Sequence, residues 1–319
     1  MSSTKCKETI KAMGGEFQWS CFPQTYLSKK DVELIFDQAR AEVKRIEDKF
    51  TDFKPSYFNR INEMAGISPV QVDLETITLI KKAREFSDFS DGIFDISFAS
   101  VGHLWRQAKD KGNILDKEII KSQLKFINYK EVIIDEEKLT VFLPFVQMRI
   151  GLGGIGKGYA VDRVYDLFLK QGLTNFMVNG AGDIRVHSRA DAPRQWRVSV
   201  RNPLSKDPSK SVGVIQLSDG AIASSGGYIH NVKGDQFNHH IIHPKTGVSA
   251  PSVIASTVLA ENAIVADVTA TILMNLSGLD SVKYLDKMNL NGFVYEADGK
   301  CYLSKKSLMN FGMPLEVRA

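Results

Sequence analysis

The hydrophobic positions of the chain follow a helical period in several long segments. Between Val32 and Phe50, apolar residues recur every three or four positions, and Ser28 with Asp31 has the signature of a short capping box just before them. Further helices are expected over four segments that are helical in pattern: residues 73–87, 157–171, 262–275 and 280–288. The chain therefore contains amphipathic helices that each bury one face.

Other segments have the pattern of strands. Residues 196–201 alternate apolar and polar side chains, as a half-buried strand does. Short apolar or β-rich runs predict four more strands, at residues 132–134, 139–142, 175–178 and 252–259. Surface loops are expected at residues 202–203, 206–210 and 233–235, with a turn at 244–247. No repeat or long linker divides the chain, so we predict one α+β domain over residues 1–319, with about the first ten residues disordered.

Composition excludes several classes of function. The 319 residues carry a net charge of +4 with no basic block, which argues against a nucleic-acid partner. No run of apolar residues is long enough for a membrane span. Cys6, Cys21 and Cys301 are odd in number and far apart, so no disulfide framework or metal cluster is indicated. Without a signal segment or lipoprotein site we expect a cytoplasmic protein, although a chain starting after a removed signal would look the same.

Residues 151–159, GLGGIGKGY, concentrate five glycines and Lys157 directly after an apolar run. Glycine permits positive φ and lets bare backbone approach a ligand, and a following helix adds the positive end of its dipole. This combination is typical of a phosphate-binding loop, with Lys157 as a mobile charge. The alternative to a phosphate-binding loop is a purely structural tight turn where a strand meets a helix.

Two well-known phosphate motifs fit the stretch only in part. The dinucleotide fingerprint G-x-G-x-x-G is present, but the next strand-like run ends in Asn179 where an acidic residue is required. The pattern G-x-x-x-x-G-K of a P-loop is also present, but Gly158 stands where Ser or Thr should hold Mg²⁺. The glycines therefore indicate a phosphate ligand without identifying it.

A second candidate site is Asp267 with Thr271. The two residues are four positions apart, so on a helix their oxygens share a face. Oxygen ligands without Cys or His suit a hard cation such as Mg²⁺. A solvated helix face with the same spacing is the simpler interpretation of this pair by itself.

A third candidate lies at residues 238–247, which contain three of the six histidines. Alternation before the turn would place His240 and Ile242 on one face and His239, Ile241 and His243 on the other. The spacing matches no standard zinc site. A polar loop edge and a general base beside a bound phosphoanhydride both remain open.

In the order in which they occur, eight segments of this chain resemble motifs of one family, the FAD:protein FMN transferases or ApbE family. The closest likeness is GGIGKGYAVD at 153–162, which is similar to G-G-I-A-K-G-Y-A-V-D. The others run along nearly the whole chain: residues 13–15 (Met-Gly-Thr), 50–62 (S-x-Y-x-x-x-S-x-x-x-x-x-N), 90–96 with Trp105 (S-D-G-x-F-D-[IV] and a later Trp), 179–185 (N-x-G-G-D-I-R), 223–226 (A-T-S-G), 240–247 (H-I-I-D-P-x-T-G) and 266–271 (A-D-x-x-A-T).

This resemblance implies a fold and an activity. The fold would be ApbE-like and related to the T-fold, with mixed, largely antiparallel sheets flanked by helices. The activity would be Mg²⁺-dependent transfer of the FMN moiety of FAD to a Ser or Thr hydroxyl of an acceptor flavoprotein, with release of AMP. Such covalent flavinylation splits a phosphoanhydride, which requires charge neutralisation and a base.

The resemblance also assigns residues. The Gly156 carbonyl, Asp267 and Thr271 would hold Mg²⁺, and His240 would activate the acceptor hydroxyl. The residues implied for FAD binding are Met13, Phe53, Phe94, Asp95, Ile96, Gly151, Gly154, Lys157 and Ile241.

The chain departs from the family pattern at five positions. Gly151, His243 and Gly227 each replace an Asp, and Gly15 and Phe53 each lose a hydroxyl. Loss of acidic residues around the site is expected to weaken FAD binding or to shift specificity. Two other functions therefore stay open: a Mg²⁺-dependent FAD pyrophosphatase that gives FMN and AMP, and a non-catalytic FAD carrier.

Overall fold

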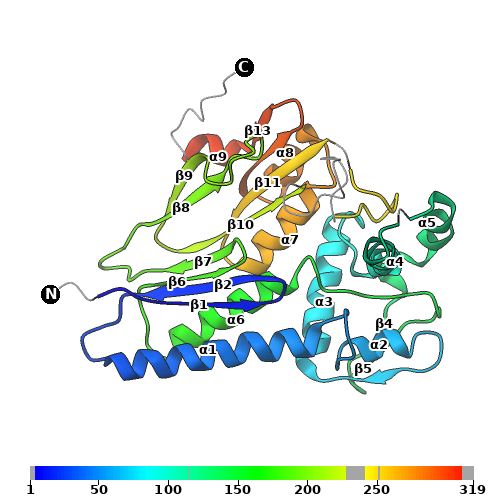
Figure 1. Cartoon of the computed structure of the whole chain (residues 1–319), viewed down its shortest axis with the longest axis horizontal. Helices are drawn as coiled ribbons and strands as arrows, with labels where there is room; N and C mark the ends of the chain where they lie inside the picture. Colours follow the sequence, from blue (N-terminus) through cyan, green and yellow to red (C-terminus); the bar gives the residue numbers. More distant parts are fainter. Residues whose placement is uncertain (1–3, 114, 228–240, 251, 311–319) are drawn as a thin grey trace. The chain divides into compact units, whose positions relative to one another are not determined.

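The computed structural model describes residues 4–113, 115–227, 241–250 and 252–310 (Figure 1). The chain separates into two compact units, which are described one at a time. Unit 1 consists of Met1–Glu47, Ile155–Gly226 and Ser252–Ala319, and unit 2 of Asp48–Gly154 and Gly227–Pro251. That both units form one domain stays a prediction.

Unit 1 is built on an open sheet of eight strands in which every pair of neighbours is antiparallel. The strands follow the order β1 (Cys6–Ala12), β2 (Gly15–Cys21), β6 (Phe176–Gly180), β7 (Asp183–His187), β10 (Gly220–Gly226), β11 (Val253–Ala260), β12 (Asn291–Glu296) and β13 (Cys301–Leu303). Some neighbours, such as β2 and β6, therefore come from segments that are far apart in the sequence.

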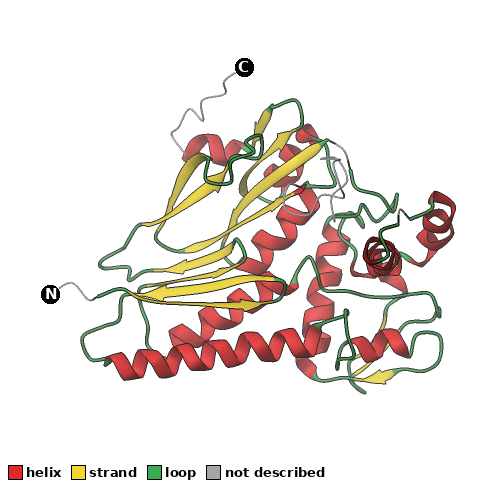
Figure 2. Cartoon of the chain, viewed as in Figure 1, coloured by secondary structure: helices red, strands yellow, loops and turns green. Residues whose placement is uncertain are grey.

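Helices pack on one face of this sheet (Figure 2). They include α6 (Gly156–Lys170) against β6 and β7, α7 (Ala263–Leu273) against β10 and β11, and α8 (Gly278–Lys287) and α9 (Lys305–Asn310) against β12. The long helix α1 (Lys29–Phe50) joins this layer where Phe36 packs between the rings of Trp19 and Phe168. Ser28 and Asp31 form the predicted capping box, because each side chain accepts the other's backbone N–H.

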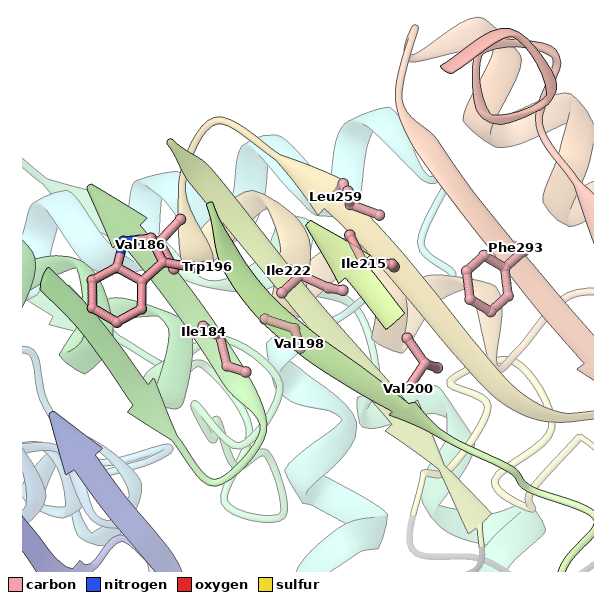
Figure 3. Close-up of a cluster of buried hydrophobic side chains, with 9 residues drawn as sticks. All are labelled: Ile184, Val186, Trp196, Val198, Val200, Ile215, Ile222, Leu259 and Phe293. Carbon is pink, nitrogen blue, oxygen red and sulfur yellow. The ribbon is translucent and has the colours of Figure 1, made fainter. Parts of the chain in front are cut away.

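The opposite face of the sheet is covered by a hairpin, β8 (Trp196–Arg201) and β9 (Ser211–Leu217). A cluster of buried apolar side chains joins the hairpin to the sheet (Figure 3): Ile184, Val186, Trp196, Val198, Val200, Ile215, Ile222, Leu259 and Phe293. Strand β7 shows how the pleat divides the two faces. The side chains of Ile184 and Val186 belong to this cluster. The side chains that alternate with them, those of Asp183, Arg185 and His187, each contact a side chain of α6.

Unit 2 contains a small antiparallel sheet and short helices. The sheet has the order β3 (Val70–Gln71), β5 (Thr140–Phe142) and β4 (Ile133–Asp135). The helices are α2 (Asn59–Glu63), α3 (Leu74–Phe89), α4 (Ala99–Asp110) and α5 (Lys117–Gln123), with 3₁₀ turns η1 (Ile96–Phe98), η2 (Leu124–Phe126) and η3 (Tyr129–Glu131). The Asn62 side chain donates to the Ile150 carbonyl at 2.9 Å and accepts its N–H at 2.8 Å, which fixes the backbone just before Gly151.

The structure confirms the α+β class, the antiparallel sheets flanked by helices, and the predicted helices and strands to within a few residues. Two expectations are wrong. Residues 6–10 are ordered, because they pair with β2 as part of β1. Residues 241–243 form no strand, and Ile241 and Ile242 are both buried, so the expected strand alternation is not seen among them. Among the described residues, no helix combines the length and apolar character that a membrane crossing requires.

Candidate functional site

The predicted site residues divide between the two units. Unit 1 holds Met13, Gly156, Lys157, Asp267 and Thr271, whereas unit 2 holds Phe53, Phe94, Asp95, Ile96, Gly151, Gly154 and Ile241. The predicted base, His240, and its neighbour His239 lie outside the described residues. Each group is therefore described within its own unit.

In unit 1, Lys157 lies between two buried carboxylates, and we call Lys157, Asp183 and Asp267 the lysine–carboxylate cluster. The Lys157 ammonium donates to Asp183 and lies 3.5 Å from an oxygen of Asp267. Both aspartates are only 2% exposed, and the Lys157 side chain is 30% exposed. The sequence brings three separate elements together here: the first turn of α6, the start of β7 and the middle of α7.

The electrostatics of this cluster favour a bound cation. Burial disfavours charge on Lys157, but the two carboxylates outweigh it, so its pKa lies above the ordinary value and the ammonium stays charged. Burial, followed by repulsion from Asp267, raises the pKa of Asp183 to about 7. Burial also raises the pKa of Asp267, against the opposing effects of Lys157 and the Gly158 N–H. When both aspartates are ionised, two negative charges face one positive charge, which leaves the cluster attractive to a second cation.

Two aspartates cap the helices α6 and α7 reciprocally. Ile155 precedes α6 and offers no side-chain cap, so Asp267 of α7 accepts the Gly158 N–H at 3.0 Å in its place. In return, Asp162 of α6 accepts the N–H groups of Ala263 and Ile264 at the start of α7, at 2.9 and 3.0 Å. A carboxylate at a helix N-terminus is stabilised by the exposed N–H groups and the dipole. The position of Asp267 is therefore fixed by both helices.

Gly158 has a packing role instead of a ligand-binding one. A Cβ at this position would lie 2.6 Å from the Ala263 carbonyl oxygen, so glycine is required for α6 and α7 to approach so closely. In addition, no glycine between 151 and 158 adopts a positive φ. The expectation that the stretch exploits positive φ is therefore wrong, and the absence of Ser or Thr at 158 follows from helix packing.

The oxygen donors at this place fit a magnesium ion. Asp267 and Thr271 both lie on α7 with the predicted spacing of one turn, and Gly156 is the buried first residue of α6, next to Lys157. Carboxylate, hydroxyl and carbonyl oxygens are the donors that Mg²⁺ prefers, and the ion usually takes only one or two carboxylates plus phosphate or water. Within the described ranges, no three His, Cys, Asp or Glu side chains converge into a complete metal site. Phosphate oxygens of a substrate would complete the coordination.

Met13 lies in the tight turn between β1 and β2. Its φ of 50° and that of Gly14, 74°, are both left-handed, as a two-residue hairpin turn requires. The Met13 N–H donates to Glu47 at 2.6 Å. Gly15 follows because a Cβ there would lie 2.5 Å from the Cβ of Ala181, in the turn that precedes Asp183.

In unit 2, three consecutive predicted residues lead into η1, which begins at Ile96 with Asp95 as its N-cap, and all three are buried. Phe94, Asp95 and Ile96 are 6%, 5% and 1% exposed. Asp95 accepts hydrogen bonds from the Ser97 N–H at 2.7 Å and hydroxyl at 2.6 Å, and from the Tyr129 N–H at 3.0 Å. Burial raises its pKa in spite of these donors. The carboxylate of Asp95 therefore holds the surrounding backbone in place.

The remaining predicted residues of unit 2 lie on loops. Phe53 is 70% exposed, Gly154 is half-buried and Gly151 is buried, with its N–H donating to the Ile96 carbonyl at 2.9 Å. Ile241 is 9% exposed and comes directly before the turn at 244–247. These residues belong to three sequence segments of the same unit.

His243 is engaged in the turn that was predicted at 244–247. Its Nδ1 accepts the N–H of Lys245 at 3.1 Å, and its carbonyl accepts the N–H groups of Thr246 and Gly247 at 3.1 and 2.8 Å. Burial, and then Lys245, lower the pKa of His243. The lowered pKa favours the neutral ring, and its Nδ1 holds the turn.

No role was predicted from the sequence for Asp183 or Asp162. Both lie in segments that carry the family resemblance, 179–185 and 153–162, so the motifs contained the signal. The contacts of the lysine–carboxylate cluster could not be predicted from the sequence. Lys157 is 26 residues from Asp183 and 110 residues from Asp267.

Comparison with known proteins supplies the family. The family model described as "ApbE family" matches residues 13–294. An FAD:protein FMN transferase of Klebsiella pneumoniae is 29% identical over 237 residues, 73% of each chain, and one of Haemophilus influenzae is 24% identical over 96% of this chain and 93% of its own. The crystal structure of the ApbE protein of Thermotoga maritima superposes with a TM-score of 0.87 at 28% identity, over 96% of this chain and 99% of that one.

A flavin transferase of Vibrio cholerae has the same fold, with a TM-score of 0.80 at 22% identity over 95% of this chain and 98% of its own. The predicted fold type and the prediction that the protein is an enzyme are both confirmed by these matches. The chain belongs to the ApbE family.

Proposed function

We propose that the protein transfers the FMN moiety of FAD to a Ser or Thr hydroxyl of an acceptor flavoprotein, releases AMP and depends on Mg²⁺. The observation that carries this proposal is the lysine–carboxylate cluster. It combines a charged lysine and buried oxygen donors in a chain that is 29% identical to an FAD:protein FMN transferase. Cleavage of a phosphoanhydride requires both a cation-binding site and a positive charge beside it.

Residues of unit 1 would bind the diphosphate of FAD. Asp267, Thr271 and the Gly156 carbonyl would hold Mg²⁺, which neutralises charge on the phosphate oxygens when it is bound. The Lys157 ammonium is held between Asp183 and Asp267, and it would bind a phosphate oxygen as a point charge. Asp183 keeps Lys157 in place and prevents its ammonium from losing a proton.

Within unit 2, the residues that the family resemblance assigns to FAD are suited to a planar ligand. Phe53 presents an exposed ring on which a planar heterocycle can stack. Phe94, Ile96 and Ile241 contribute buried apolar surface, and Asp95 holds the backbone that carries the first two. Gly154 leaves backbone available for close approach, whereas the Gly151 N–H is already bonded to the Ile96 carbonyl.

The proton of the acceptor hydroxyl would go to His240, as the family resemblance implies. The alternative base, His243, is less suited, because its Nδ1 already accepts a backbone N–H within the turn. Assaying His240→Ala and His243→Ala with one acceptor protein separates the two. We expect a loss of about 10²–10⁴ in rate for His240→Ala only.

The test of the function is mass spectrometry of a candidate acceptor protein after incubation with FAD and Mg²⁺. The proposal expects an FMN adduct on a Ser or Thr residue and an equal amount of AMP. The adduct should be lost in Asp267→Asn and retained in Asp166→Asn, a change at an exposed position of α6. Release of FMN and AMP without an acceptor would instead show a pyrophosphatase, and intact FAD after prolonged incubation would show a carrier. The cytoplasmic location stays a prediction.

A further inference from the structure

The space beside Gly151 is occupied by the carboxylate of another residue. A Cβ at position 151 would lie 3.1 Å from Oδ2 and 3.5 Å from Cγ of Asp52, and 3.2 Å from the Cβ of Ala99. The φ of Gly151 is not in the left-handed region, so its backbone does not require glycine. A side chain at 151 would therefore press against the carboxylate of Asp52, from the loop after α1, and against Ala99.

Asp52 is held in place from one side. Arg106 of α4 donates through Nη2 to Asp52 Oδ2 at 2.7 Å, and its guanidinium carbon lies 4.2 Å above the centre of the Phe53 ring. The Asp52 side chain is 7% exposed and that of Arg106 is 31% exposed. A guanidinium that pairs with a carboxylate and stacks on a ring is a rigid arrangement, because both contacts fix its plane.

The second oxygen of Asp52 is unused by the protein. Among the described residues, Oδ2 takes the bond from Arg106, and no donor reaches Oδ1. Asp52 Oδ1 is not among the buried oxygens that lack a partner, so it is open to solvent and can accept a hydrogen bond from a ligand N–H or O–H. Phe53, the residue next to Asp52, presents a ring that is 70% exposed and can stack on the same ligand.

We propose that Asp52 is a ligand-binding and specificity-determining residue, which accepts a hydrogen bond from an N–H or O–H group of the nucleotide stacked on Phe53. The inference rests on the proposed function, because it takes FAD as the ligand. Asp52 binds the ring or sugar part of the nucleotide and not the diphosphate, since two anions repel one another. Arg106 and Phe53 position this carboxylate.

The experiment moves the carboxylate from residue 52 to residue 151. The variants are Asp52→Ala, Gly151→Asp and the double variant, and FAD affinity is measured by fluorescence quenching without Mg²⁺ or acceptor. Asp52→Ala removes a hydrogen bond to a charged acceptor and should weaken FAD binding by roughly tenfold or more. Gly151→Asp should also weaken it, because two carboxylates then compete for one space. The double variant should recover most of the affinity.

Controls separate binding from folding. Asp110→Ala changes an exposed residue of α4, one turn beyond Arg106, and should leave the affinity unchanged. Asp52→Asn keeps the shape of the side chain and should weaken binding less than Asp52→Ala does. Thermal unfolding of each variant identifies any that lose structure.

Two results would overturn the inference: FAD affinity within about twofold of wild type in both Asp52→Ala and Asp52→Asn, or no recovery in the double variant. Because affinity is measured without acceptor, these outcomes are independent of transfer. An active transferase with unchanged affinity in the Asp52 variants would refute this inference alone, whereas an inactive wild-type protein would refute the proposed function alone.

Discussion

The carboxylate of Asp162 fixes the helix that carries Asp267, and its removal has a calculable effect. Asp162 accepts two N–H groups at the start of α7 and pairs with Arg185 at 2.7 Å. Hydrogen bonds to a charged acceptor contribute about 1.5–3 kcal/mol each. Burial raises the pKa of Asp162, so the cost of desolvating the carboxylate offsets part of this gain. We therefore expect Asp162→Ala to lower the free energy of unfolding by about 3 kcal/mol, the lower end of the two-bond sum.

The assay is urea denaturation followed by circular dichroism. With a slope of about 3 kcal/mol per molar urea, the midpoint should fall by about 1 M. Asp162→Asn keeps one acceptor oxygen and should lie between wild type and Asp162→Ala. The matched control is Asp166→Ala, an exposed position one turn further along α6, which should change stability by no more than about 0.5 kcal/mol. Equal midpoints for Asp162→Ala and Asp166→Ala would refute the capping argument.

Three further predictions follow from distances and charges. Gly158→Ala should destabilise the protein by about 1–3 kcal/mol in thermal unfolding, because its Cβ would meet the Ala263 carbonyl oxygen at 2.6 Å; an unchanged melting temperature contradicts this. Gly15→Ala should be destabilising alone but tolerated together with Ala181→Gly, since the two Cβ atoms would be 2.5 Å apart; two additive losses in a double-mutant cycle would show that they do not interact. Because the pKa of Asp183 is raised to about 7, Mg²⁺ affinity measured by calorimetry should rise with pH up to about 7 and then level off. For the same reason, the metal-free protein should lose stability as pH rises through this value. The Asp183→Asn variant should flatten both profiles.

Elements with a long period or a clear stop signal could be predicted from sequence. The helix that begins after Ser28 and the strand at 196–201 occur where their patterns place them, because each buries one complete face of an extended segment. Most strands of the large sheet were missed, namely β1, β2, β7, β10, β12 and β13, since such strands are specified by their neighbours more than by their own periodicity.

The chemistry of the site could be predicted only as far as residue types allow. Lys157 and Asp267 were identified from the glycine stretch and from helical spacing, but their contact depends on the crossing of two helices. Gly151 was expected to mark the loss of a carboxylate, whereas Asp52 occupies that space from a loop about a hundred residues earlier. Such a replacement is a property of three-dimensional proximity, and one sequence contains no signal of it.

The antiparallel sheet of unit 1 has a consequence for synthesis of the chain. The β1–β2 hairpin is complete after Cys21, but its partner β6 begins only at Phe176. The residues of unit 2 from Asp48 to Gly154 are translated in between as one uninterrupted stretch, so they can fold first. Pairings of long sequence separation form slowly, and an unpaired strand edge promotes association between chains. The nascent chain therefore exposes the free edge of β2 for about half of its translation, and aggregation during expression should begin at this edge.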